Sequence, residues 1–188
     1  LRLDRNQGKA EAVRRGLLEA SQSESQFLAY WDADLATPLE ALPEFRSILD
    51  ANPELLLVMG SRVRLLGREI QRRALRHYLG RIFATAASFV LGLPVYDTQC
   101  GAKMFRKTPF VVELWAEPFR SRWIFDVELI ARLVRQSRLA NGEALPPTRV
   151  IYELPLLRWH DIKGSKVRAG DFLRAGWELW TIHRYLKR

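Results

Sequence analysis

The chain has 188 residues, a length that supports one domain with a sizeable core. Its net charge of +9 indicates an anionic partner, and the absence of a long Lys/Arg run favours phosphate-bearing substrates or a membrane surface over nucleic acid. A single cysteine excludes an internal disulfide framework.

The first predicted element is a helix over residues 10–20, which is rich in Ala, Leu and Glu. Asn6 stands where it could cap this helix. The amino end of a helix carries free N–H groups and Lys9 adds a positive charge, so an anion could dock there. A plain cap with a solvated lysine is an equal alternative. The chain opens without a methionine, almost directly at this helix, and we expect an upstream portion to exist.

An apolar run over residues 27–31 ends abruptly in two carboxylates, Asp32 and Asp34. The run is typical of a buried strand, and in open α/β sheets ligands bind at the carboxyl ends of the strands. Two acids at this spacing suit Mg²⁺ or Mn²⁺, which take oxygen ligands and share them with substrate phosphates. The alternative is a solvated loop in which an Asp caps the next helix.

A second unit of the same kind follows. A helix is predicted to run to about residue 52 and to stop at Pro53, and residues 55–60 read as another buried strand. This strand delivers Arg62 to its carboxyl end. Alternating strands and helices predict an α/β fold with a mostly parallel sheet.

Residues 68–93 are predicted to form one or two long helices, basic at the start and apolar at the end. Such a segment is either a solvated basic face packed on a core or a surface that lies against anionic lipid. Its longest uncharged stretch, residues 82–95, is too short to span a bilayer.

Residues 95–106 are polar and glycine-containing between apolar neighbours, which predicts a loop entering a site. Thr108 is expected to cap a short helix, and a longer helix is expected from about residue 122 to 137. Asp126 and Glu128 open that longer helix, either as partners of its dipole or as functional carboxylates.

The last third of the chain is predicted to contain an edge strand over residues 148–155, because Pro155 would not suit a central strand. In the basic loop that follows, Ser165 and Lys166 could hold a phosphate, although an ordinary solvated loop is as good an interpretation. Residues 171–186 predict an amphipathic helix that packs on the domain, lies in a membrane interface or leads toward a segment that lies outside this chain.

Several motifs occur in an order that resembles the polyprenyl-phosphate sugar synthases of glycosyltransferase family 2, in particular the dolichyl-phosphate β-glucosyltransferases. The resemblance covers nearly the whole chain, and its most specific parts are Asp-Thr-Gln-Cys-Gly at 97–101 and Arg-Trp-x-Phe-Asp-Val-Glu at 122–128. The other matching motifs are Asn-Gln-Gly-Lys at 6–9, Asp-Ala-Asp at 32–34, Gly-Ser-Arg at 60–62 and Gly-Ser-Lys at 164–166.

The resemblance implies a single, N-terminally incomplete GT-A domain, a Rossmann-like α/β fold, over residues 1–188. It also implies inverting transfer of a sugar, glucose in the first instance, from a nucleotide sugar such as UDP-glucose to a polyprenyl phosphate. The partners implied are the nucleotide sugar, the lipid phosphate and the cytoplasmic face of a membrane, with Mg²⁺ or Mn²⁺ as the cofactor.

The resemblance also implies roles for individual residues. A metal on Asp34, with Asp32 beside it, would neutralise the leaving diphosphate. Asp97, Asp126 and Glu128 are the catalytic candidates, in an orienting or weakly basic role. Two further groups are implied: Lys9, Asp32 and Asp34 at the nucleotide sugar, and Arg62, Lys103, Ser165 and Lys166 at the acceptor phosphate.

Two other hypotheses remain open from the sequence. One keeps the fold but changes the donor to mannose or N-acetylglucosamine, or the acceptor to a saccharide. The other, from a different class, is a non-catalytic basic module that docks on a membrane and for which Asp34 is dispensable.

Overall fold

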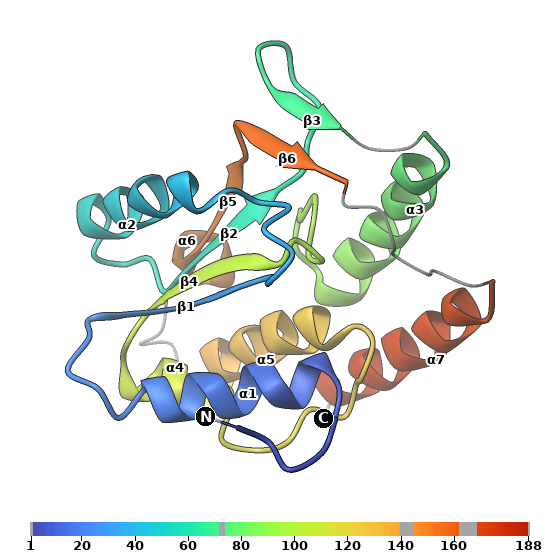
Figure 1. Cartoon of the computed structure of the whole chain (residues 1–188). Coiled ribbons are helices and arrows are strands. Elements are labelled where there is room, and N and C mark those ends of the chain that lie inside the picture. The colour runs from blue at the N-terminus through green and yellow to red at the C-terminus, as the bar shows by residue number, and fades with distance from the viewer. Residues whose placement is uncertain (1, 72–73, 140–144, 162–168, 188) are drawn as a thin grey trace.

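A four-stranded sheet lies at the centre of the protein, in a computed structural model that describes residues 2–71, 74–139, 145–161 and 169–187 (Figure 1). In order across the sheet, the strands are β1 (Phe27–Trp31), β4 (Ala102–Arg106), β2 (Leu57–Ser61) and β5 (Ile151–Pro155). The predicted strand over residues 27–31 is confirmed to the residue. β5 is the predicted edge strand, but residues 148–150 of the predicted range belong to a short helix.

The strand directions place four chain segments at one edge of the sheet. β2 and β5 are parallel neighbours, whereas β4 runs antiparallel to both β1 and β2. Three strands therefore share one direction, which agrees with the predicted α/β class. The predicted mostly parallel sheet is confirmed only in part, because the antiparallel β4 lies between β1 and β2. Because β4 is reversed, its amino end lies beside the carboxyl ends of the other three strands.

Helices cover both faces of the sheet, and alternation along β2 determines which residues reach each face. Leu57 and Met59 enter the core beneath α1 (Lys9–Ala20) and α5 (Phe125–Leu139). Val58 packs on the other side with Phe45 and Leu49 of α2 (Leu42–Ala51), as expected for a strand with period two. β2 is buried throughout, because both of its faces are covered.

The remaining elements surround this centre. A second, parallel pair of strands, β3 (Glu69–Gln71) and β6 (Arg158–His160), lies beyond the main sheet. α3 (Ala74–Leu91) and α7 (Ala169–Leu186) contact each other on one side of the molecule (Figure 1). Short helical segments complete the fold: η1 (Leu39–Ala41), α4 (Pro109–Glu113) and α6 (Pro147–Val150). Among the described residues, none of the helices is long and apolar enough to cross a membrane.

Three local predictions can be compared directly with the structure. Thr108 caps α4 as predicted, since its side chain accepts the Val111 N–H at 3.1 Å. Asn6 does not cap α1, because Gly8 occupies the N-cap position with φ 88° and Asn6 instead accepts the Gly8 N–H. The predicted loop over residues 95–106 is wrong in its second half, which forms β4.

Candidate functional site

The Lys9–Asp32 ion pair lies where β1 meets the start of α1. Asp32 follows directly after β1, and its carboxylate contacts the Lys9 ammonium at 2.6 Å. Both side chains are partly exposed, at 46% for Lys9 and 35% for Asp32, so the pair is accessible to a ligand. The structure thus brings together two residues that the sequence assigns to one nucleotide-sugar site.

Asp34 lies two residues further along the chain and is exposed. One of its oxygens accepts the Ala36 N–H at 3.1 Å, which fixes the carboxylate locally. Leu35 adopts a positive φ of 54°, which is unusual for a residue other than glycine. Within the described ranges, no group of three His, Cys, Asp or Glu side chains could hold a metal by itself. Two carboxylates nevertheless fit a Mg²⁺ or Mn²⁺ ion that takes its other ligands from a bound diphosphate and water.

Gly101 packs directly against the Asp32 carboxylate. The Asp32 N–H donates to the Gly101 carbonyl at 2.7 Å, and a Cβ atom at residue 101 would lie 2.0 Å from Asp32 Cγ. Its backbone has no unusual φ, so close approach explains the glycine. The glycine of the 97–101 motif and the first acid of the 32–34 motif therefore form one contact.

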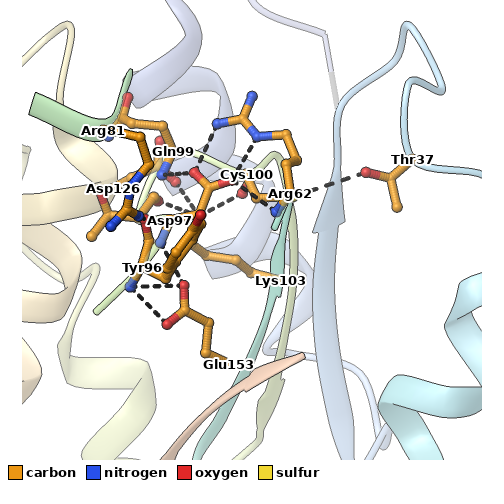
Figure 2. A network of polar contacts seen from close by, with 11 residues as sticks. Thr37, Arg62, Arg81, Tyr96, Asp97, Gln99, Cys100, Lys103, Asp126 and Glu153 are labelled. Carbon is orange, nitrogen blue, oxygen red and sulfur yellow. Dashed lines mark hydrogen bonds and ion pairs between the residues drawn. The ribbon is translucent and has the colours of Figure 1, made fainter. Parts of the chain in front are cut away.

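Arg62 and Asp97 form a second ion pair on the neighbouring part of the edge (Figure 2). The guanidinium donates to both carboxylate oxygens, at 2.6 and 2.8 Å, and the Arg62 backbone N–H adds a third bond. Burial alone would lower the pKa of Arg62, but the adjacent Asp97 carboxylate outweighs it and the net shift is upward. Arg62 is consequently a fixed, permanent cation, which also lies over the Trp159 ring.

Lys103 does not reach this surface, which argues against its predicted contact with an acceptor phosphate. Its side chain is fully buried, and its ammonium uses three donors on Thr98 O, Cys100 O and the Asp126 carboxylate, at 3.0, 2.7 and 2.5 Å. The reason is topological, because residue 103 belongs to a central strand and not to a loop.

Asp126 and Glu128 point in different directions and do not act as a pair. Side chains two positions apart on a helix are separated by a rotation of about 200° around the helix axis. Asp126 therefore faces the sheet, where it accepts from Lys103 and Tyr30. Glu128 faces the opposite way, where it accepts from Arg132 and the Ser121 N–H. Both carboxylates are 3% exposed and fully engaged inside the protein.

A small pocket beside the Arg62–Asp97 pair contains residues that the sequence analysis missed. Arg81 lines it from α3, with its guanidinium 3.7 Å from the centre of the Tyr96 ring. The Thr98 hydroxyl and the Gln99 amide nitrogen are buried beside it and find no partner within the described part of the chain. Two features of the sequence could have indicated these residues. Thr98 and Gln99 belong to the 97–101 motif, and Arg81 belongs to the basic part of the segment 68–93.

The thiol of Cys100 is free and buried among these groups. Burial raises its pKa to about 11, which makes the thiol a poor nucleophile at neutral pH. Its closest polar contact is the Thr37 hydroxyl at 3.9 Å (Figure 2). The two remaining predicted acceptor residues, Ser165 and Lys166, lie outside the described residues.

The chain is similar to a known protein family and to several curated proteins. The model of the family described as Glycosyl transferase family 2 matches residues 1–112. The chain is 32% identical to the dolichyl-phosphate beta-glucosyltransferase of Drosophila melanogaster, over 99% of this chain and 54% of that protein. It is 30% identical to dolichyl-phosphate beta-glucosyltransferase ALG5C of Trichomonas vaginalis (97% and 51% covered) and 28% identical to the Saccharomyces cerevisiae enzyme (89% and 48%). The chain spans about half the length of these curated relatives.

Proposed function

Because the chain belongs to glycosyltransferase family 2, we propose that it transfers glucose from UDP-glucose to a polyprenyl phosphate with inversion at the anomeric carbon. One observation carries the proposal: residues 97–101 contact both the acidic site at Asp32 and the cationic site at Arg62. A negatively charged donor and a negatively charged acceptor need two such sites side by side. The names of the relatives supply the sugar and the lipid.

The donor side is assigned to Lys9, Asp32 and Asp34. A divalent cation, Mg²⁺ or Mn²⁺, would be held by Asp34 with help from Asp32, and when bound it supplies positive charge to the departing diphosphate. Lys9 holds Asp32 in place and adds its own charge at the amino end of α1. The free N–H groups of that helix end favour the same anion.

The acceptor side is assigned to Arg62, with Arg81, Thr98 and Gln99 around it. Two guanidinium groups line this pocket together with the buried Thr98 hydroxyl and Gln99 amide nitrogen, which find no partner within the described part of the chain, and an anionic, oxygen-rich group would suit it. Ser165 and Lys166 remain proposed contributors, on the strength of the sequence resemblance alone. Lys103 is withdrawn from this list, because all of its donors are used internally.

The transfer itself asks little of a general base. The second pKa of a phosphate monoester is about 6, so the attacking oxygen is largely ionised at neutral pH. As this oxygen bonds to the anomeric carbon, the bond from that carbon to the diphosphate breaks and UDP leaves. We therefore assign Asp97 the role of orienting Arg62, and Asp126 and Glu128 roles inside the protein.

The proposal can be tested with labelled donors. The purified chain is incubated with polyprenyl phosphate, Mg²⁺ and, in turn, radiolabelled UDP-glucose, GDP-mannose and UDP-N-acetylglucosamine. Chloroform-soluble product from UDP-glucose, lost when a chelator is added, is the expected result. Product from another donor would change the sugar but keep the reaction class, and no product from any donor would favour the non-catalytic module.

The acceptor lipid also implies a membrane surface, and α3 and α7 are proposed to meet it. Tyr78, Ile82 and Phe89 of α3 are strongly exposed and lie on one helical face by their spacing. Trp177 and Trp180 of α7 are 66% and 48% exposed, with ring centres 5.0 Å apart. Exposed aromatic residues on a chain of net charge +9 fit an anionic lipid interface.

Replacing Trp177 and Trp180 together with serine is expected to weaken partitioning onto phosphatidylcholine vesicles containing phosphatidylglycerol by about tenfold or more. Two large aromatic surfaces are lost, while the fold should persist because both rings are exposed. Vesicle sedimentation measures the effect, and Leu66→Ser, at an exposed site in another part of the molecule, is the matched control. Equal binding by the double variant and the original chain would contradict the role of α7.

A further inference from the structure

Residues 96–101, named here the site loop, contact both halves of the proposed site. The loop has no regular secondary structure between α3 and β4. Asp97 within it orients Arg62 on the acceptor side, and Gly101 at its end packs on Asp32 on the donor side. Because the loop lacks regular secondary structure, its backbone must be held in place by side chains from outside the loop.

Lys103 supplies that means from beneath the loop (Figure 2). Its ammonium donates to the carbonyl oxygens of Thr98 and Cys100, so two loop carbonyls that would otherwise be buried without donors are satisfied. The third donor goes to Asp126, which balances the buried charge and also accepts from Tyr30. The loop is thereby tied to β4 and α5 through Lys103, and to β1 through the bond between Tyr30 and Asp126.

Glu153 holds the opposite end of the loop from β5. Its carboxylate accepts the backbone N–H groups of Tyr96 and Asp97, which lie at the start of the loop. Burial raises the pKa of Glu153, although the two N–H groups act in the other direction. The sequence offers no motif around this glutamate, and only the pairing of β5 with β2 brings it to the same edge as Arg62.

We propose that Lys103 and Glu153 are positioning residues, which fix the two ends of the site loop so that Asp97 orients Arg62 while Gly101 leaves room for Asp32. The proposal rests on the proposed function for the identity of the two ligands. It differs from a direct contact of Lys103 with the acceptor, which would affect one side only. It also differs from a purely structural role, which would change stability and leave ligand affinities alone.

Lys103→Met and Glu153→Leu are the variants that separate these roles. For Lys103→Met, we expect the Kd of UDP-glucose, measured calorimetrically with Mg²⁺, and the KM of polyprenyl phosphate both to rise by about tenfold or more. For Glu153→Leu, we expect the acceptor KM to rise more than the donor Kd, because the released N–H groups adjoin Asp97. Glu153→Gln should restore part of the affinity, since one amide oxygen can still accept these N–H groups.

Amide hydrogen exchange provides a measurement that needs no activity. We expect faster exchange in both variants to be confined to residues 96–101, compared with β2. The control is Lys107→Met, since Lys107 lies beyond the other end of β4 and its ammonium donates to the exposed Ser23 carbonyl. This control should change neither the loop exchange nor the two ligand constants.

The outcomes are distinguishable. A rise in acceptor KM alone, with unchanged loop exchange, would mean that Lys103 contacts the acceptor and would overturn the proposal. Unchanged constants with a lower melting temperature would reduce Lys103 to a structural residue. If the unaltered chain binds no UDP-glucose, the proposed function fails, but confined loop exchange would still support positioning and unchanged or global exchange would refute it.

Discussion

Replacing Asp34 with alanine is expected to lower the turnover number for glucose transfer by about 10³-fold or more. The exposed carboxylate is the proposed holder of the divalent cation, and a metal that neutralises a leaving group supplies several kcal/mol to the transition state. Because the side chain is exposed and makes only a local bond to the Ala36 N–H, the melting temperature should change little. The measurements are initial rates with UDP-glucose and calorimetric binding of UDP with and without Mg²⁺.

The matched control for this prediction is Asp50→Ala. Asp50 is also an exposed aspartate, paired with Arg46 along α2, and its removal should leave the rate unchanged. In the Asp34 variant, vesicle binding should survive, since α3 and α7 are untouched. Undiminished turnover, or a UDP affinity in the original chain that does not depend on Mg²⁺, would remove the metal from the proposal.

Replacing Gly101 with alanine should weaken UDP-glucose binding by about 10–100-fold, although the substitution adds only one methyl group. The new Cβ would lie 2.0 Å from Asp32 Cγ, so the short carboxylate side chain must move and the Lys9 contact with it. Forced displacement in a packed site also costs about 1–3 kcal/mol of stability. Calorimetry with UDP-glucose and thermal unfolding measure the two effects.

Gly16→Ala is the matched glycine control. Gly16 lies within α1 and a Cβ there would meet no atom within 4 Å, so alanine should stabilise the helix by roughly 0.5–1 kcal/mol and leave donor binding unchanged. Wild-type donor affinity in Gly101→Ala would show that Asp32 tolerates displacement, and the donor site would then have to be assigned to other residues.

The strand that ends at Trp31 shows why part of this site can be predicted from the sequence. An apolar, aromatic run followed by two acids predicts a buried strand that ends at the acids, because charged residues do not belong in the buried part of a strand. The second strand and Arg62 follow by the same reasoning. These elements depend on local periodicity, which the sequence contains in full.

Lys103 shows where that reasoning fails. A lysine beside glycine and polar residues looks like a loop cation, and nothing in residues 95–106 indicates that the second half pairs with two strands. Pairing is a long-range property, and it turns an expected ligand-binding residue into a fully buried one. Asp126 illustrates the same limit, since its partners Lys103 and Tyr30 come from segments distant in the chain.

The amino-acid sequence by itself determined the α/β class, the two strands that deliver Asp32 and Arg62, and the ordered motifs of a family 2 glycosyltransferase. The tertiary structure alone decided which charged side chains are exposed at the sheet edge and which are paired inside the protein. The physical reason is that periodicity and motif spacing are local, whereas the reversed strand β4, the contact of Gly101 with Asp32 and the reach of Glu153 to the site loop exist only after distant segments pack together.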